Sequence, residues 1–287
     1  MIFAAMKTGF AQAWANKRLI LLYYLTNLAF GTILMLPFRS VLRDFVGNSL
    51  MGEKLAGRLD MDFLFEFIKE NPNLLSSYLI LLPLLLIGYW LIMLFFSGGA
   101  FSLFIRGEKF SAAEFWGNAA KYFGRFIRLV LWSIPFGIAL FCLQFIWNGL
   151  QRILFGSDPY QSVVYWGGWI KVGIRYLSFI LFFLLLDYAR IYVVSKDEKR
   201  MRTSLVQALK FAATNFWIMF GFASLLFLIG IICLILYNPI ADLLHSPNSI
   251  IILLLFFWQQ FYLAARMILR LTLYAGEVKL YQTISIN

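Results

Sequence analysis

Six long apolar runs constrain the fold of this chain more than any other feature. Each run extends for at least 20 residues, and the chain is 62% apolar and only 14% charged. An α-helix needs about 20 such residues to cross roughly 30 Å of hydrocarbon, whereas soluble domains average about 25% charged residues. We therefore predict an all-α, polytopic membrane protein whose spans are Leu19–Phe38, Leu75–Phe96, Phe126–Trp147, Val172–Val194, Phe216–Tyr237 and Ser249–Leu271.

The basic residues indicate how such spans are oriented. An even number of spans places both termini on one side, and 17 of the 25 Lys and Arg residues fall on that side. The opposite side carries eight basic and eight acidic residues, so the whole formal charge of +11 lies with the termini. Cytoplasmic loops carry this excess in membrane proteins. We predict a multi-pass protein of a bacterial inner membrane, with the N- and C-termini in the cytoplasm.

The same charge distribution predicts partners. A basic rim on the cytoplasmic side would attract anionic lipid head groups by roughly 1 kcal/mol per residue, so nucleic acid is not needed to explain the charge. Membrane lipids are the expected partners, and a protein partner is a second possibility. The rim comprises Arg125, Arg128, Lys199, Arg200, Arg202 and Lys210.

A repeated pattern divides the predicted single domain, residues 1–287, into three tandem units. Ser111–Glu114 and Ser204–Gln207 fit the capping box, in which a hydroxyl residue is followed three positions later by Glu or Gln at a helix start. Both precede an amphipathic stretch that leads into a span, and the N-terminal segment follows the plan more loosely. We predict units at about 1–104, 105–197 and 198–287, each with a cytoplasmic interfacial helix and a hairpin of two spans.

Two further segments carry local predictions. In the long connection 41–73, Asp60 and Asp62 precede an apolar stretch, which predicts a short acid-capped helix that ends before Asn71 and Pro72. Gly98 and Gly99 end the second span, where two adjacent glycines indicate a close approach of another backbone.

Asp187 is the leading candidate for function. It lies inside the fourth predicted span, and Arg190 follows one turn later. A charged side chain within a membrane span is costly, so such a residue is a functional hypothesis by default, and its partner should be sought on another span.

The last span supplies candidate partners for Asp187. Gln259, Tyr262, Arg266 and Arg270 recur every three or four residues and so form one polar stripe on a helix. At about 1.5 Å per residue, Asp187 and Arg266 are level, roughly 6 to 9 Å on the cytoplasmic side of the midplane. We predict an ion pair between them, with Arg190 and Arg270 one turn lower, near the head groups. The cluster either fixes two spans together or provides a titrating carboxylate and an anion site.

Several enzyme classes find no support in the sequence. His245 is the single histidine, no nucleotide-binding fingerprint occurs, and both cysteines lie in apolar runs. We predict no catalytic residues, no metal site and no cofactor. The preferred interpretation is a non-enzymatic scaffold or accessory subunit that interacts with lipid or a protein partner. The alternative is a transporter or lipid-translocating protein with a site between the fourth and sixth spans, which a cavity reaching Asp187 and Arg266 would favour.

Three motifs resemble an uncharacterised family of bacterial six-span inner-membrane proteins. They are the segments 187–191 (DYARI), 259–266 (QQFYLAAR) and 270–275 (RLTLYA). The layout of small-residue turn, capping-box helix and hairpin is more distantly similar to the membrane domain attached to some glycerophosphodiester phosphodiesterases. The resemblance implies a bacterial inner-membrane location and no established activity.

Overall fold

The computed structural model describes residues 1–47, 60–156, 159–244 and 248–286, so His245 lies outside the described residues. Throughout these ranges the regular structure is helical. The helices are α1 (Ile2–Ala15), α2 (Lys17–Val46), α4 (Met61–Glu70), α5 (Pro72–Arg106), α6 (Ala112–Phe155), α7 (Gln161–Lys196), α8 (Met201–Thr214), α9 (Phe216–Leu243) and α10 (Ser249–Ile286).

Six of these helices are long and apolar enough to cross a membrane: α2, α5, α6, α7, α9 and α10. Each contains one predicted span, which confirms the all-α, six-span fold of an integral membrane protein. Most extend several residues past the predicted limits, because a helix continues through polar residues until its backbone is turned. Gly47, Gly107 and Gly156 provide such turns after α2, α5 and α6, with φ of 54°, 69° and 78°.

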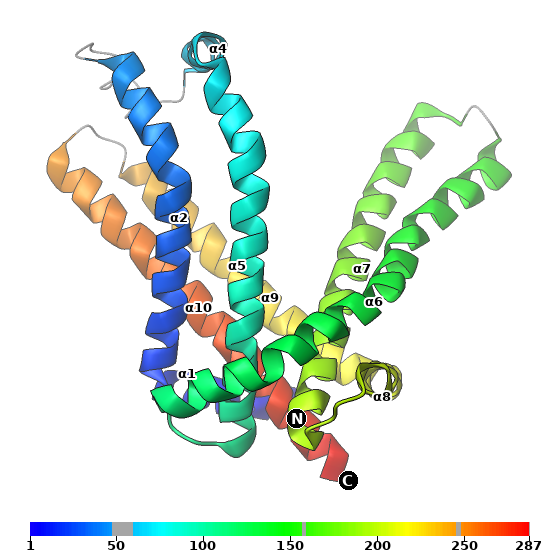
Figure 1. The fold of residues 1–287 in the computed structure, drawn as a ribbon. Helices are drawn as coiled ribbons and strands as arrows, with labels where there is room; N and C mark the ends of the chain where they lie inside the picture. The colour runs from blue at the N-terminus through cyan, green and yellow to red at the C-terminus, as the bar shows by residue number, and fades with distance from the viewer. Residues whose placement is uncertain (48–59, 157–158, 245–247, 287) are drawn as a thin grey trace.

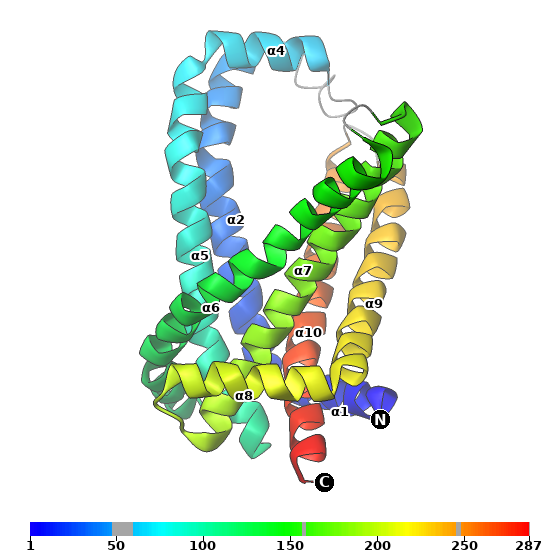
Figure 2. The same ribbon diagram turned by 90° about the vertical axis from the view of Figure 1, so that its right-hand side faces the viewer.

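The spans diverge from one end of the molecule to the other (Figure 1). Both termini lie at the narrow end, called here the terminal end, where α1 and α8 run across the spans (Figure 2). Helix α4 lies across α2 and α5 at the opposite end (Figure 2). The threefold repeat and the placement of α1 and α8 at a membrane surface remain predictions.

The predicted helix starts are partly wrong. Ser111 precedes α6, but its side chain makes no capping hydrogen bond. Ser204 lies inside α8, where its hydroxyl donates to the Arg200 carbonyl oxygen at 3.2 Å. Instead, the Glu198 carboxylate accepts hydrogen bonds from the backbone amides of Lys199 and Arg200, the two residues that precede α8, each at 2.9 Å. The Ser204–Gln207 pattern therefore arises within a helix that has already begun one turn earlier.

The acid-capped helix in the long connection is confirmed. Asp60 Oδ1 accepts hydrogen bonds from the amides of Asp62 and Phe63 at 3.0 and 3.2 Å, and α4 ends at Glu70. Phe63 and Phe67 form the buried face of this helix, and both rings pack against Phe45 at the end of α2.

The tightest packing lies at the terminal end, where the last turns of α5, α7 and α10 are buried. The predicted close approach at Gly98 and Gly99 is confirmed. A Cβ at Gly99 would lie 2.5 Å from the Phe115 ring on α6, far inside van der Waals contact. Only glycine fits between these helices.

Candidate functional site

A cavity of about 770 Å³ lies between α7, α9 and α10. Its walls are mostly apolar, and Phe179 and Phe227 on these walls are 51% and 55% exposed, so the cavity opens toward the lipid-facing surface. Four charged side chains also line it: Asp187 on α7, and Arg266, Arg270 and Glu277 on α10. A space that is apolar along its walls and charged in one part suits an amphiphile.

The predicted ion pair between Asp187 and Arg266 is wrong. Asp187 Oδ1 instead accepts a hydrogen bond from Arg190 Nη1 at 2.9 Å, and both residues are only 6% exposed. Residues three apart on a helix face the same side, so α7 supplies both partners without help from α10. Arg190 is thus buried beside Asp187 inside the protein, and its position near the head groups stays a prediction.

Arg266 faces the open part of the cavity. Its guanidinium lies 5.9 Å from the centre of the Tyr262 ring, which in turn stacks on Tyr237 of α9 at 4.6 Å. The Arg266 side chain makes no hydrogen bond or ion pair with the described residues, and the residue is exposed. Its donors are therefore free to bind a ligand.

Only part of the polar stripe predicted on α10 lines the cavity. Tyr262, Arg266 and Arg270 share the cavity, whereas Gln259 is exposed and does not line it. The neighbouring Gln260 makes the contact between helices, because its Oε1 accepts a hydrogen bond from the Tyr24 hydroxyl on α2 at 2.7 Å.

Arg270 joins the cavity to a polar network across three helices. Its guanidinium donates to the hydroxyls of Tyr274 and of Tyr89 on α5, each at 3.3 Å. Tyr89 donates in turn to Asn27 Oδ1 on α2 at 3.0 Å, and Asn27 Nδ2 lies 3.0 Å from the Met267 sulfur. This network fixes α2, α5 and α10 together and orients the Arg270 side chain.

Glu277 is the site residue that the sequence prediction missed. It is completely buried, and neither carboxylate oxygen has a hydrogen-bond partner among the described residues. Asp187 and Arg190 lie within electrostatic range of it. A signal was present, because eleven residues complete just over three helical turns and so place Glu277 on the face of Arg266. The prediction passed over it because the apolar run ends at Leu271.

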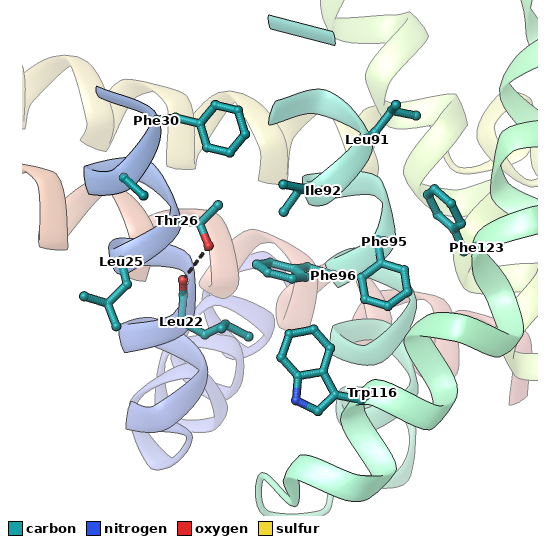
Figure 3. Close-up of a pocket in the computed structure, with 11 residues that line it drawn as sticks. Leu22, Leu25, Thr26, Phe30, Leu91, Ile92, Phe95, Phe96, Trp116 and Phe123 are labelled. Carbon is teal, nitrogen blue, oxygen red and sulfur yellow. Dashed lines mark hydrogen bonds between the residues drawn. The ribbon is translucent and has the colours of Figure 1, made fainter. Parts of the chain in front are cut away.

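A second hollow, of about 640 Å³, lies between α2, α5 and α6 (Figure 3). Phe30, Phe95, Phe96 and Trp116 surround it, and the Thr26 hydroxyl already donates to the Leu22 carbonyl at 2.9 Å. No charged side chain lines this hollow. It offers apolar contact alone and suits an acyl chain.

A charged cluster outside the spans links α6 to the connection between α7 and α8. Asp197 Oδ1 accepts from Arg125 at 2.7 Å and lies 3.0 Å from Lys121 Nζ. These hydrogen bonds, first that from Lys121 and then that from Arg125, lower the pKa of the Asp197 carboxyl below its ordinary value. The carboxylate form therefore helps to hold this connection in place.

Comparison of the chain with family models, curated proteins and solved structures found no match.

Proposed function

We propose that the chain is a non-enzymatic protein of a bacterial inner membrane that binds an amphiphilic lipid between α7, α9 and α10. The cavity that opens among lipid-facing side chains and ends in Asp187, Arg266, Arg270 and Glu277 carries this proposal. Charged groups at the depth of a span are expensive to maintain, and they usually mark a binding site or a path for a polar group.

Of the two roles considered from the sequence, this cavity favours the transporter or lipid-translocating role. A scaffold needs only an outer surface, and its spans could pack without a hollow of this size. A translocating protein needs an apolar space that accepts chains and polar groups that receive the head. Both are available on α10, where exposed apolar side chains precede Arg266 along the helix.

One observation favours the scaffold as the second candidate. The hydrogen bonds from Arg270 through Tyr89 to Asn27 join α2, α5 and α10, as a rigid support would require. In that role the basic rim would face anionic lipid or a protein partner at the terminal end.

Filling the cavity tests the lipid-binding proposal. Gly230 lines the cavity, and a Cβ there would meet open space, so Gly230→Trp should occupy part of the hollow and obstruct a lipid without disturbing the packed helices. Lipid retained after purification, measured by native mass spectrometry, should fall at least several-fold.

Gly31→Trp is the matched control, because Gly31 on α2 also has open space around it and lies outside the cavity. It should retain as much lipid as the parent. Equal retention by both variants would refute lipid binding at this site and leave the scaffold role.

A further inference from the structure

We propose that the cavity between α7, α9 and α10 is built for a zwitterionic phospholipid whose head group ends in a primary ammonium. The phosphate would lie against Arg266 and Arg270, and the ammonium against Asp187 and Glu277. This inference rests on the proposed function and names the class of lipid.

The order of the groups along α10 matches the order of the groups in such a lipid. Arg266, Arg270 and Glu277 follow one another along α10, and Asp187 of α7 lines the same cavity. The side of Arg266 away from Glu277 is lined by apolar residues, among them Phe179 and Leu234. From the opening of the cavity toward the terminal end, α10 presents apolar residues, then Arg266 and Arg270, then Glu277. Acyl chains, phosphate and ammonium follow in the same sequence.

The phosphate position follows from the available donors. Arg266 has no hydrogen bond to the described residues, and its planar guanidinium can donate two bonds to one phosphate. Arg270 donates hydrogen bonds to Tyr274 and Tyr89, and these two tyrosines hold its side chain in place beside the cavity. A free cation next to an oriented cation provides the arrangement that a phosphate group binds.

The ammonium position follows from the carboxylates. Both oxygens of Glu277 are buried without a donor among the described residues, so they favour a ligand group that can donate hydrogen bonds to them. A primary ammonium has three N–H donors, whereas a quaternary ammonium has none. Since the Glu277 oxygens are covered, its side chain must shift for direct contact, and Asp187, which is 6% exposed, meets the ammonium first.

A competition among three phospholipids with identical acyl chains tests the assignment. Purified protein receives equal amounts of phosphatidylethanolamine, phosphatidylcholine and phosphatidylglycerol, and native mass spectrometry measures what is retained. We expect phosphatidylethanolamine to exceed each of the others by about tenfold, the ratio typical of one charge-assisted hydrogen bond. Equal retention of the three lipids would overturn the inference.

Two variants assign the roles of the charges. Glu277→Gln keeps the shape of the side chain and should lower the ethanolamine-to-glycerol ratio several-fold while phosphatidylglycerol binding persists, because Asp187 alone then receives the ammonium. Arg266→Gln, at an exposed position, should reduce all three lipids alike. Glu108→Gln, at an exposed acid outside the cavity, should leave the ratio unchanged. An unaltered ratio in Glu277→Gln would refute the ammonium site.

The inference and the proposed function fail in different ways. If Gly230→Trp loses lipid but the parent does not distinguish the three lipids, the lipid site stands and the head-group assignment falls. If Gly230→Trp retains all three, the function itself falls. A last experiment adds free phosphoethanolamine, which has the head group but no acyl chains. At a concentration equal to that of the lipid it should not displace the lipid. Displacement would contradict a lipid site, because it would show that the head group alone is recognised.

Discussion

Asp187 and Arg190 form a buried ion pair within one helix, and each residue depends on the other for compensation of its charge. The pair lies within electrostatic range of Glu277, which has no such partner among the described residues. Removing one member of a buried pair leaves an uncompensated charge, which typically costs about 3 to 5 kcal/mol. The two acids therefore respond differently to neutralisation.

Asp187→Asn should lower the free energy of unfolding by about 3 kcal/mol, because Arg190 then remains buried without a countercharge. Thermal unfolding of the purified protein in detergent measures the change. Arg266→Ala is the control and should shift stability by less than about 0.5 kcal/mol, since Arg266 is exposed and unpaired with other described residues. Equal stability of Asp187→Asn and the parent would contradict this account of the pair.

For single residues, the sequence predicted which charged side chains belong to the site better than it predicted their partners. Asp187, Arg266 and Arg270 were found because charges stand out in apolar runs, and all three line one cavity. The partner of Asp187 was predicted wrongly because depth along the helices cannot reveal how a side chain is directed. Arg190, three residues away, reaches Asp187 without any rearrangement of helices.

The contact between α5 and α6 depends on Gly99. A methyl group there would overlap the Phe115 ring, so Gly99→Ala should destabilise the protein by about 1 to 3 kcal/mol, the usual cost of overpacking. Gly124→Ala on α6 is the matched control, because a Cβ there meets open space and alanine favours the helix by about 1 kcal/mol. Comparison of the two thermal unfolding midpoints checks the prediction, which fails if Gly99→Ala is as stable as the control.

The connection between α7 and α8 should respond to acid. The pKa of Asp197 is lowered in the folded protein by hydrogen bonds from Lys121 and Arg125, so its carboxylate stabilises the fold above the unfolded pKa of about 3.9. That contribution is lost as the pH falls through the lower folded value. Asp197→Asn should therefore be less stable than the parent at pH 7, by less than about 1 kcal/mol because the pair is exposed.

Below about pH 4 the difference between Asp197→Asn and the parent should shrink toward zero. Asparagine suits this position, where φ is 49°, so the comparison isolates the charge. Unfolding midpoints measured across the pH range check the convergence. A difference that is constant with pH would show that the carboxylate contributes nothing through its charge.

Elements could be predicted where one local signal was sufficient. Apolar run length found all six spans, and Asp60 correctly marked the start of α4. Ser111 correctly marked the start of α6, although it makes no side-chain cap. The second capping box failed because hydroxyl residues also occur inside helices, where Ser204 donates back to the preceding turn. Gly98 and Gly99 predicted a close approach, but the aromatic residue that fills it could not be identified from spacing alone.

The orientation of the whole molecule can be tested by labelling. In a background with Cys142 and Cys233 replaced by alanine, Tyr160→Cys should react with a membrane-impermeant maleimide in intact cells. Lys199→Cys should react only after the cells are permeabilised, since the excess of basic residues lies on its side. Tyr160 and Lys199 are both exposed. The opposite pattern of labelling would reverse the proposed topology.

The arrangement of the spans was the least predictable part of the molecule. Helix α7 and the consecutive helices α9 and α10 enclose the main cavity, and hydropathy cannot specify which spans separate to form it. Glu277 was missed for a related reason, since α10 continues well beyond the apolar run that located it. Both features depend on packing between helices, which a single sequence does not specify.

The contact between α1 and α10 has a consequence for the synthesis of the protein. Gly9 fits so closely against α10 that a Cβ there would lie 2.7 Å from the Thr272 carbonyl oxygen and 2.8 Å from the Gly276 amide nitrogen. Helix α1 thus packs against a helix that is translated only after the spans between them. Until translation reaches α10, the inner face of α1 around Ala5 and Gly9 lacks that partner, so this contact can form only after the intervening spans have been made.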